Sequence, residues 1–233
     1  MVEEALTLQD HLAELRQRLV KSVIFFLLAF VLSYAVSDYL ISFLFLPVRQ
    51  CLPPGSTMVF TSLTEGFMAY LKVSFWAAVV ISAPFFFYQL WRFLLPALYE
   101  KEKRVLKKLL VGCAALFVFG GFFGYWVILP VILSLSMGYA GENLIPMPRL
   151  QNYLVFTLKS IFLFGLIFEL PFLMAGVSRL GFVPKGYFKK NRKFAYIILF
   201  LTCALLVPTD FFSQLLLFVP MITVYEIGTF FAR

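Results

Sequence analysis

The chain has 233 residues, of which 62% are hydrophobic, 19% aromatic and only 14% charged. A water-soluble domain of this size cannot bury so much apolar surface, so the composition indicates an integral membrane protein. The net charge of +8 does not indicate nucleic-acid binding. The basic residues lie at the ends of apolar segments and form no continuous groove or helix face.

A helix is predicted over residues 7–20. Its apolar stripe follows helical spacing: Leu8, Leu12, Leu15 and Leu19. Asp10, Glu14 and Arg18 follow at intervals of four on the opposite flank. We expect this amphipathic helix to lie at the cytoplasmic membrane interface and to lead into the first span. Glu14 is then either part of a binding site or half of an ordinary ion pair with Arg18, worth a few tenths of a kcal/mol.

Six apolar segments are predicted to be membrane helices, at about 22–45, 66–90, 106–132, 153–177, 194–208 and 211–231. A span needs about twenty apolar residues, and the fifth segment reaches only about 22 Å, so we expect a short hairpin with the sixth. Pro84, Pro171 and Pro220 should kink their helices, which favours a concave bundle. The chain, 1–233, is predicted to be one all-α membrane domain with ordered external loops.

The basic residues predict the orientation. Sixteen of the twenty Lys and Arg residues fall at 1–21, 91–108, 178–193 and Arg233. Because Lys and Arg concentrate on the cytoplasmic side of membrane proteins, we expect both termini in the cytoplasm.

Topology does not require the acids that accompany the first two basic stretches. They are Glu3, Glu4, Asp10, Glu14, Glu100 and Glu102. Glu102 is either a surface acid favoured at a helix start or, with Glu14, one of two carboxylates on adjacent cytoplasmic surfaces. Such a pair suits arginine, because a guanidinium forms two parallel hydrogen bonds to a carboxylate and an ammonium cannot.

Polar residues inside the spans are further candidates. Glu169 lies deep in the fourth span, where a charged acid costs several kcal/mol. It is either functional or a neutral carboxyl bonded to carbonyls freed by Pro171. Gln214 could bond to another helix, and Asp210 is most simply a helix cap. A Gly-x-x-x-Gly pattern at 120–124 permits close helix packing within the bundle or between copies.

No motif for catalysis or metal binding stands out. The chain has one histidine, three cysteines without a plausible pairing, and no P-loop, H-E-x-x-H or G-x-S-x-G sequence. We therefore expect no enzyme activity, no metal and no cofactor.

The sequence resembles one known family. The segment 11–19 (HLAELRQRL) resembles the N-terminal signature of TatC, the polytopic core subunit of twin-arginine protein translocation. Further matching segments are 82–84, 88–91, 93–99 with Glu102, 168–171, 208–214 and 226–228. Val207 differs, because some members have a threonine there.

This resemblance implies a receptor in the inner membrane of a prokaryote. The acids matching Glu14 and Glu102 contact the two arginines of a signal peptide at the cytoplasmic face, and Arg16 and Phe93 lie in the matching motifs that support this site. Single-span partners of the TatA and TatB type dock along the last two helices, near Gln214 and Asp210. The receptor assembles in several copies, and folded cargo crosses using the proton-motive force.

Two other functions remain open from the residues alone. One is a proton-coupled transporter of small solutes with Glu169 as its proton carrier. The other, an intramembrane hydrolase of the aspartyl type, needs two facing acids, whereas Glu169 and Asp210 are predicted at different depths.

Overall fold

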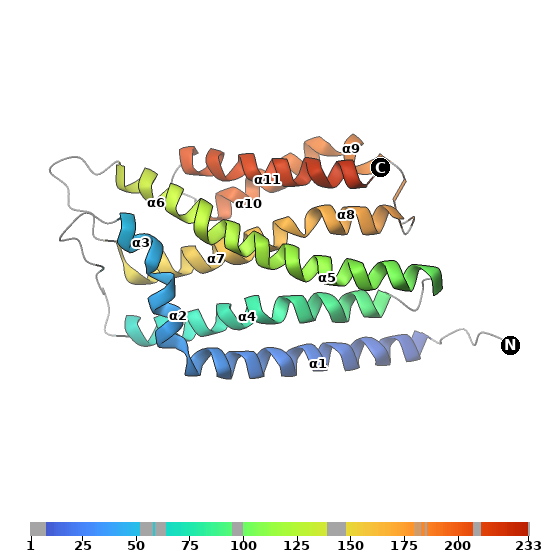
Figure 1. The fold of residues 1–233 in the computed structure, drawn as a ribbon, viewed down its shortest axis with the longest axis horizontal. Helices are drawn as coiled ribbons and strands as arrows, with labels where there is room; N and C mark the ends of the chain where they lie inside the picture. Colours follow the sequence, from blue (N-terminus) through green and yellow to red (C-terminus); the bar gives the residue numbers. More distant parts are fainter. Residues whose placement is uncertain are drawn as a thin grey trace.

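The described part of the chain is all helical. The computed structural model describes residues 8–51, 58, 64–94, 100–138, 148–179, 181, 183–184, 186–206 and 211–232. Its long helices run alternately from one end of the bundle to the other, so that α1 begins and α11 ends at the same end (Figure 1). The elements are α1 (Leu8–Ala35), α2 (Ser37–Leu44), α3 (Leu46–Cys51), α4 (Glu65–Leu94), α5 (Glu100–Phe123), a π-helical turn (Gly124–Ile128), α6 (Leu129–Gly138), α7 (Leu150–Phe168), α8 (Leu170–Arg179), α9 (Tyr187–Lys190), α10 (Arg192–Leu206) and α11 (Phe211–Phe231).

Five helical stretches among the described residues are long and apolar enough to cross a membrane. They are Ala13–Ala35, Glu65–Leu90, Gly112–Ser136, Leu150–Ser178 and Phe211–Phe231. Helix α10 has 15 residues, which confirms that the fifth apolar segment is short. Large apolar side chains face outward, with Leu32 68% and Leu205 77% exposed. Exposing so much apolar surface to water is unfavourable, whereas the hydrocarbon core of a membrane can surround it.

Helix α1 differs from the expected arrangement. The predicted interfacial helix at 7–20 and the start of the predicted span at 22–45 form one continuous helix, Leu8–Ala35. Neither Pro nor Gly occurs in this stretch, so no residue interrupts the backbone hydrogen bonding. Helix α1 ends at Ala35, and Val36 links it to α2. The short helices α2 and α3 then cross the end of the bundle (Figure 1).

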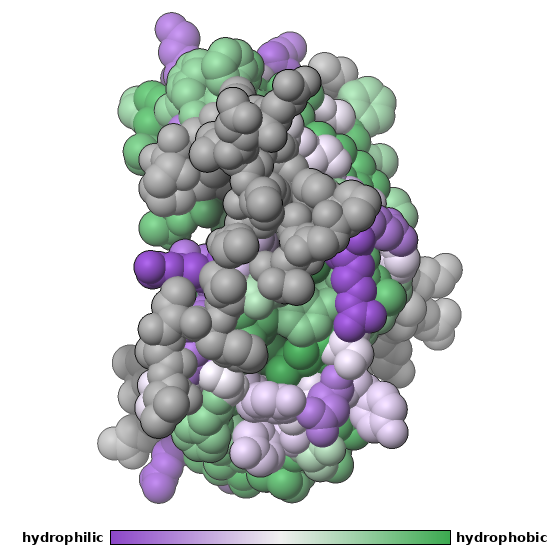
Figure 2. Space-filling model, turned by 90° about the vertical axis from the view of Figure 1, so that its left-hand side faces the viewer, coloured by the Kyte–Doolittle hydropathy of each residue, from purple (hydrophilic) through white to green (hydrophobic). Residues whose placement is uncertain are grey.

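Two tyrosines hold α2 against the long helices. The hydroxyl of Tyr125 donates to the carbonyl oxygen of Phe43, and the hydroxyl of Tyr153 donates to that of Leu44. These carbonyls lie in the last turn of α2, where no intrahelical partner remains. Figure 2 looks onto this end of the molecule, where hydrophilic residues lie among hydrophobic ones. Arg49 and Arg149 are exposed at this end.

The two glycines of the Gly-x-x-x-Gly pattern pack inside the bundle. A Cβ atom on Gly120 would lie 2.5 Å from the backbone oxygen of Phe164 on α7, and one on Gly124 would lie 3.1 Å from that of Ser160. Glycine therefore permits α5 and α7 to approach closely. The sequence left open whether these glycines permit close packing within the bundle or between copies of the chain. The structure shows packing within the bundle.

Candidate functional site

The predicted site residue Glu14 belongs to a cluster between α1 and α4. Arg18 Nε donates to Glu14 Oε1 at 3.1 Å, and Arg18 Nη2 donates to the same oxygen. Arg18 Nη1 lies 3.5 Å from Oε1 of Gln89 on α4. The side chains of Arg18 and Glu14 are 15% and 28% exposed, and Gln89 is buried. The expected pairing of Glu14 with Arg18 is thus present, and it extends across to a second helix.

The other predicted cytoplasmic residues lie at the same end of the bundle. Helix α1 begins, α4 ends and α5 begins there (Figure 1). Arg16 is exposed on α1, and Phe93 is partly buried near the end of α4. Glu102 lies in the first turn of α5, but its side chain falls outside the described part. Its pairing with Glu14 therefore stays a prediction.

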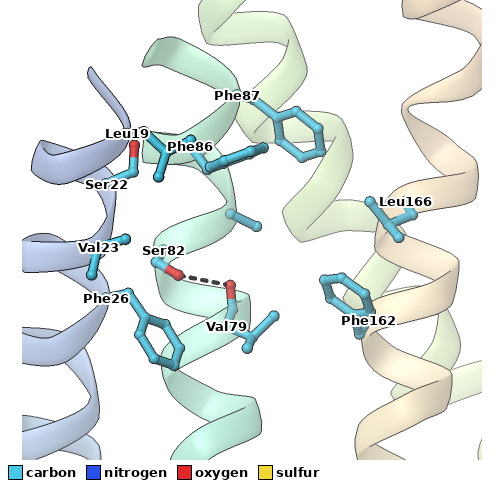
Figure 3. A pocket seen from close by; sticks show the side chains of 11 residues that line it. Leu19, Ser22, Val23, Phe26, Val79, Ser82, Phe86, Phe87, Phe162 and Leu166 are labelled. Atoms are coloured by element: carbon cyan, nitrogen blue, oxygen red, sulfur yellow. Dashed lines mark hydrogen bonds between the residues drawn. The ribbon is translucent and has the colours of Figure 1, made fainter. Parts of the chain in front are cut away.

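An apolar pocket of about 450 Å³ lies directly beyond this cluster. Figure 3 shows side chains of α1, α4 and α7 around it. Leu19 and Ser22 line it just after Arg18, and Phe86 lines it one turn before Gln89. The remaining lining residues are Val23, Phe26, Val79, Ser82, Ala83, Phe87, Phe162 and Leu166. A polar cluster therefore adjoins an almost wholly apolar cavity, an arrangement that fits a ligand with a cationic part followed by an apolar part.

Glu169 occupies the break between α7 and α8. It is fully buried, and its backbone oxygen accepts hydrogen bonds from the amides of Phe172 and Leu173 at 3.0 and 2.9 Å. The expected side-chain bonds to carbonyls freed by Pro171 are absent: within the described residues neither carboxyl oxygen has a partner. The side chain is directed towards α5 instead, where the thiol of Cys113 and the backbone of Phe117 are its neighbours. Burial of a carboxyl with so few polar neighbours is costly, and both a functional and a structural role stay open.

Gln214 lies in the first turn of the last helix, α11. Gln214 Nε2 donates to the backbone oxygen of Phe200 on α10 at 3.3 Å, which confirms the predicted bond to another helix. Asp210 falls outside the described residues, so its capping role stays untested. At the other end of the same hairpin, Glu226 accepts hydrogen bonds from Arg192 and from the hydroxyl of Tyr196.

Sequence reasoning does not predict three of the contacts that the structure shows. Gln89 is a polar residue within a long apolar helix, α4, and belongs to the matching segment 88–91, whereas Glu65 is the first residue of that helix. Glu226 was noted only as part of a motif. Each contact joins residues more than thirty positions apart (Arg18 with Gln89, Glu65 with Gln151, Arg192 with Glu226), so periodicity within one helix could not reveal it.

A family model described as "Sec-independent protein translocase protein (TatC)" matches residues 10–220. The chain belongs to the TatC family. It is 36% identical over 231 residues to TatC of Desulforapulum autotrophicum, covering 99% of this chain and 86% of that protein. It is 35% identical over 235 residues to TatC of Escherichia coli K12, covering 100% and 90%.

A crystal structure of the twin arginine translocase receptor TatC superposes with a TM-score of 0.87 at 32% identity, covering 95% of this chain and 97% of that one. A second structure of that receptor, in the detergent DDM, gives 0.88. The resemblance inferred from the motifs is thus confirmed. The protein is a multi-pass component of the inner-membrane translocase and not an enzyme.

Proposed function

We propose that this protein is the signal-peptide receptor of its translocase. The observation that carries the proposal is the partly buried cluster of Glu14, Arg18 and Gln89 next to an apolar pocket. A secretory signal peptide has this sequence of properties, because its basic start is followed by an apolar segment of 7–15 residues. The arginines bind Glu14 and Glu102 as charge-assisted forks, and the apolar segment enters the pocket. Arg16 and Phe93 support the cytoplasmic rim.

The proposed topology follows from the distribution of basic residues. All six apolar segments cross or enter the membrane, with α10 as a shortened fifth span, and both termini lie in the cytoplasm. The chain then forms one concave membrane domain. A folded cargo is too large for a bundle of this size, so the protein does not itself form the pore.

The proposed partners are single-span proteins of the TatA and TatB type. They dock beside α10 and α11, near Gln214 and Asp210, within a receptor complex that holds several copies of this chain. Exposed apolar side chains on α10, such as Leu201 and Leu205, support a helix–helix contact there. Transport of the folded cargo uses the proton-motive force.

A binding measurement tests this function. The purified full chain in detergent is titrated with a fluorescent signal peptide carrying two arginines, and with matched peptides carrying two lysines or two glutamines. We expect the affinity to decrease in the order Arg-Arg, Lys-Lys, Gln-Gln. The dissociation constants of the first and the last should differ at least about tenfold, because that is the contribution of one charge-assisted hydrogen bond. Equal binding of all three peptides would contradict a receptor for paired arginines.

A further inference from the structure

Glu14 already holds a guanidinium group. Arg18, one helical turn further along α1, directs both Nε and Nη2 to Oε1 of Glu14. The proposed ligand of Glu14 is also a guanidinium, so the residue that binds the signal peptide is engaged by the same chemical group from its own chain. This inference rests on the proposed function and concerns how its site selects a ligand.

The contact between Arg18 and Glu14 uses only part of the hydrogen-bonding capacity of the guanidinium and the carboxylate. Within the described residues both hydrogen bonds end on one carboxylate oxygen, whereas the strongest arrangement joins two nitrogens to two oxygens in parallel. The third nitrogen, Nη1, reaches Gln89 Oε1 at 3.5 Å, the outer limit for a hydrogen bond. Glu14 is also 28% exposed, so a ligand from the cytoplasm can reach it.

We propose that Arg18 is a resident competitor that makes the site selective for arginine over lysine. An arriving ligand must displace Arg18 from Glu14, and Arg18 retains Gln89 as a partner when it leaves. A guanidinium replaces the lost bonds with two parallel ones. An ammonium is a compact point charge that cannot form this fork, and it would approach a carboxylate whose charge Arg18 already neutralises. Lysine is therefore disfavoured relative to arginine by competition and not by the shape of the site.

A positioning role for Arg18 would predict a different effect of its removal. If Arg18 were a positioning residue that orients Glu14 for the peptide, its removal would weaken binding of every basic peptide. If Arg18 competes, its removal strengthens lysine binding most, since lysine gains an unoccupied carboxylate. The ratio of the two dissociation constants separates these roles, and a loss of folding alone would not change that ratio selectively.

The test compares Arg18→Met with Lys21→Met in the full chain in detergent. Both substitutions remove one positive charge from α1 and keep an unbranched side chain, and Lys21 is exposed. The probes are the Arg-Arg, Lys-Lys and Gln-Gln peptides described above. In Arg18→Met we expect the ratio of the Lys-Lys to the Arg-Arg dissociation constant to fall about fivefold, the upper range for a partly exposed ion pair. In Lys21→Met the ratio should stay as in the wild type.

Arg18→Lys is a second variant that keeps the charge if Arg18→Met does not fold. Its ammonium is a weaker competitor for Glu14, so the ratio should again fall, though by less. An unchanged ratio in these variants, or weaker binding of both peptides, overturns the proposal while the receptor function stands. If the wild type itself binds Arg-Arg no better than Gln-Gln, the receptor function is what fails.

Discussion

The carboxylate of Glu65, in the first turn of α4, accepts a hydrogen bond from the backbone N–H of Gln151 in the first turn of α7, at 3.2 Å. Glu65 is 3% exposed. Its negative charge therefore lies where the unpaired N–H groups and dipoles of two helices favour an anion. The side chain of Arg149 forms no cap for α7, so the cap comes from another helix.

Replacing Glu65 with Ala should lower the free energy of unfolding by about 1–2 kcal/mol, as the loss of a helix cap does. Denaturant titration in detergent, followed by tryptophan fluorescence, measures this. Asn152→Ala is the matched control, because Asn152 is exposed in the same turn of α7. Equal losses in the two variants would contradict the capping role.

The close approach of α5 and α7 predicts a second effect on stability. Gly120→Ala should lower the free energy of unfolding by about 1–3 kcal/mol, because the new Cβ would meet the backbone of Phe164, which cannot move aside as a flexible side chain does. Gly138→Ala is the control, since no atom of the described residues lies within 4 Å of its Cβ position. The same denaturant titration compares them, and no loss in Gly120→Ala would show that the helices are further apart.

Glu226 joins α11 to α10 through Arg192 and Tyr196. Glu226→Gln removes the charge that strengthens both hydrogen bonds, and we expect a loss of about 1 kcal/mol because the pair is partly exposed. Amide hydrogen exchange should become faster across α10, and Lys193→Gln, an exposed neighbour, should leave it unchanged. Unchanged exchange in Glu226→Gln would mean that apolar packing alone holds the hairpin.

Replacing Glu169 with an apolar residue should not lower the stability of the protein, unlike the substitutions above. Because its buried carboxyl has no partner within the described residues, Glu169→Met should leave stability unchanged or raise it by up to about 1 kcal/mol. Glu169→Gln keeps an unpaired polar group and should be less stable than Glu169→Met. The two variants are compared by thermal unfolding in the same detergent, and the opposite order would mean that the carboxyl is satisfied.

The sequence was sufficient for the membrane class, the apolar segments and the family. Composition and segment length depend only on local properties, so the short length of α10 and the range 211–231 of α11 could be predicted. Helix α10 spans Arg192–Leu206, two residues earlier than the predicted 194–208. The continuity of α1 could not be predicted in the same way. Its first part has an amphipathic pattern and its second part an apolar one, which indicates two separate elements, although no Pro or Gly divides them.

The contacts that build the site were harder to predict. Glu14 was found because an acid in a basic stretch has no role in topology. Its engagement by Arg18 was foreseen from the i, i+4 spacing, but Gln89 was not, because that contact depends on how α1 packs against α4. Glu169 was identified by its depth, whereas its orientation towards α5 and away from its own helix depends on tertiary packing.

The proposed receptor function depends most on Glu14 and Glu102 as the arginine-binding acids. Glu14→Gln and Glu102→Gln remove one charge each with little change in size, and Glu100→Gln removes the same charge two residues from Glu102. The measurement is the dissociation constant of the Arg-Arg peptide for each variant. We expect the affinity to fall about tenfold or more in Glu14→Gln and Glu102→Gln. Glu100→Gln should keep the wild-type affinity, and the unfolding temperatures should not change. Wild-type affinity in both Glu14→Gln and Glu102→Gln would contradict the proposed role of the two acids.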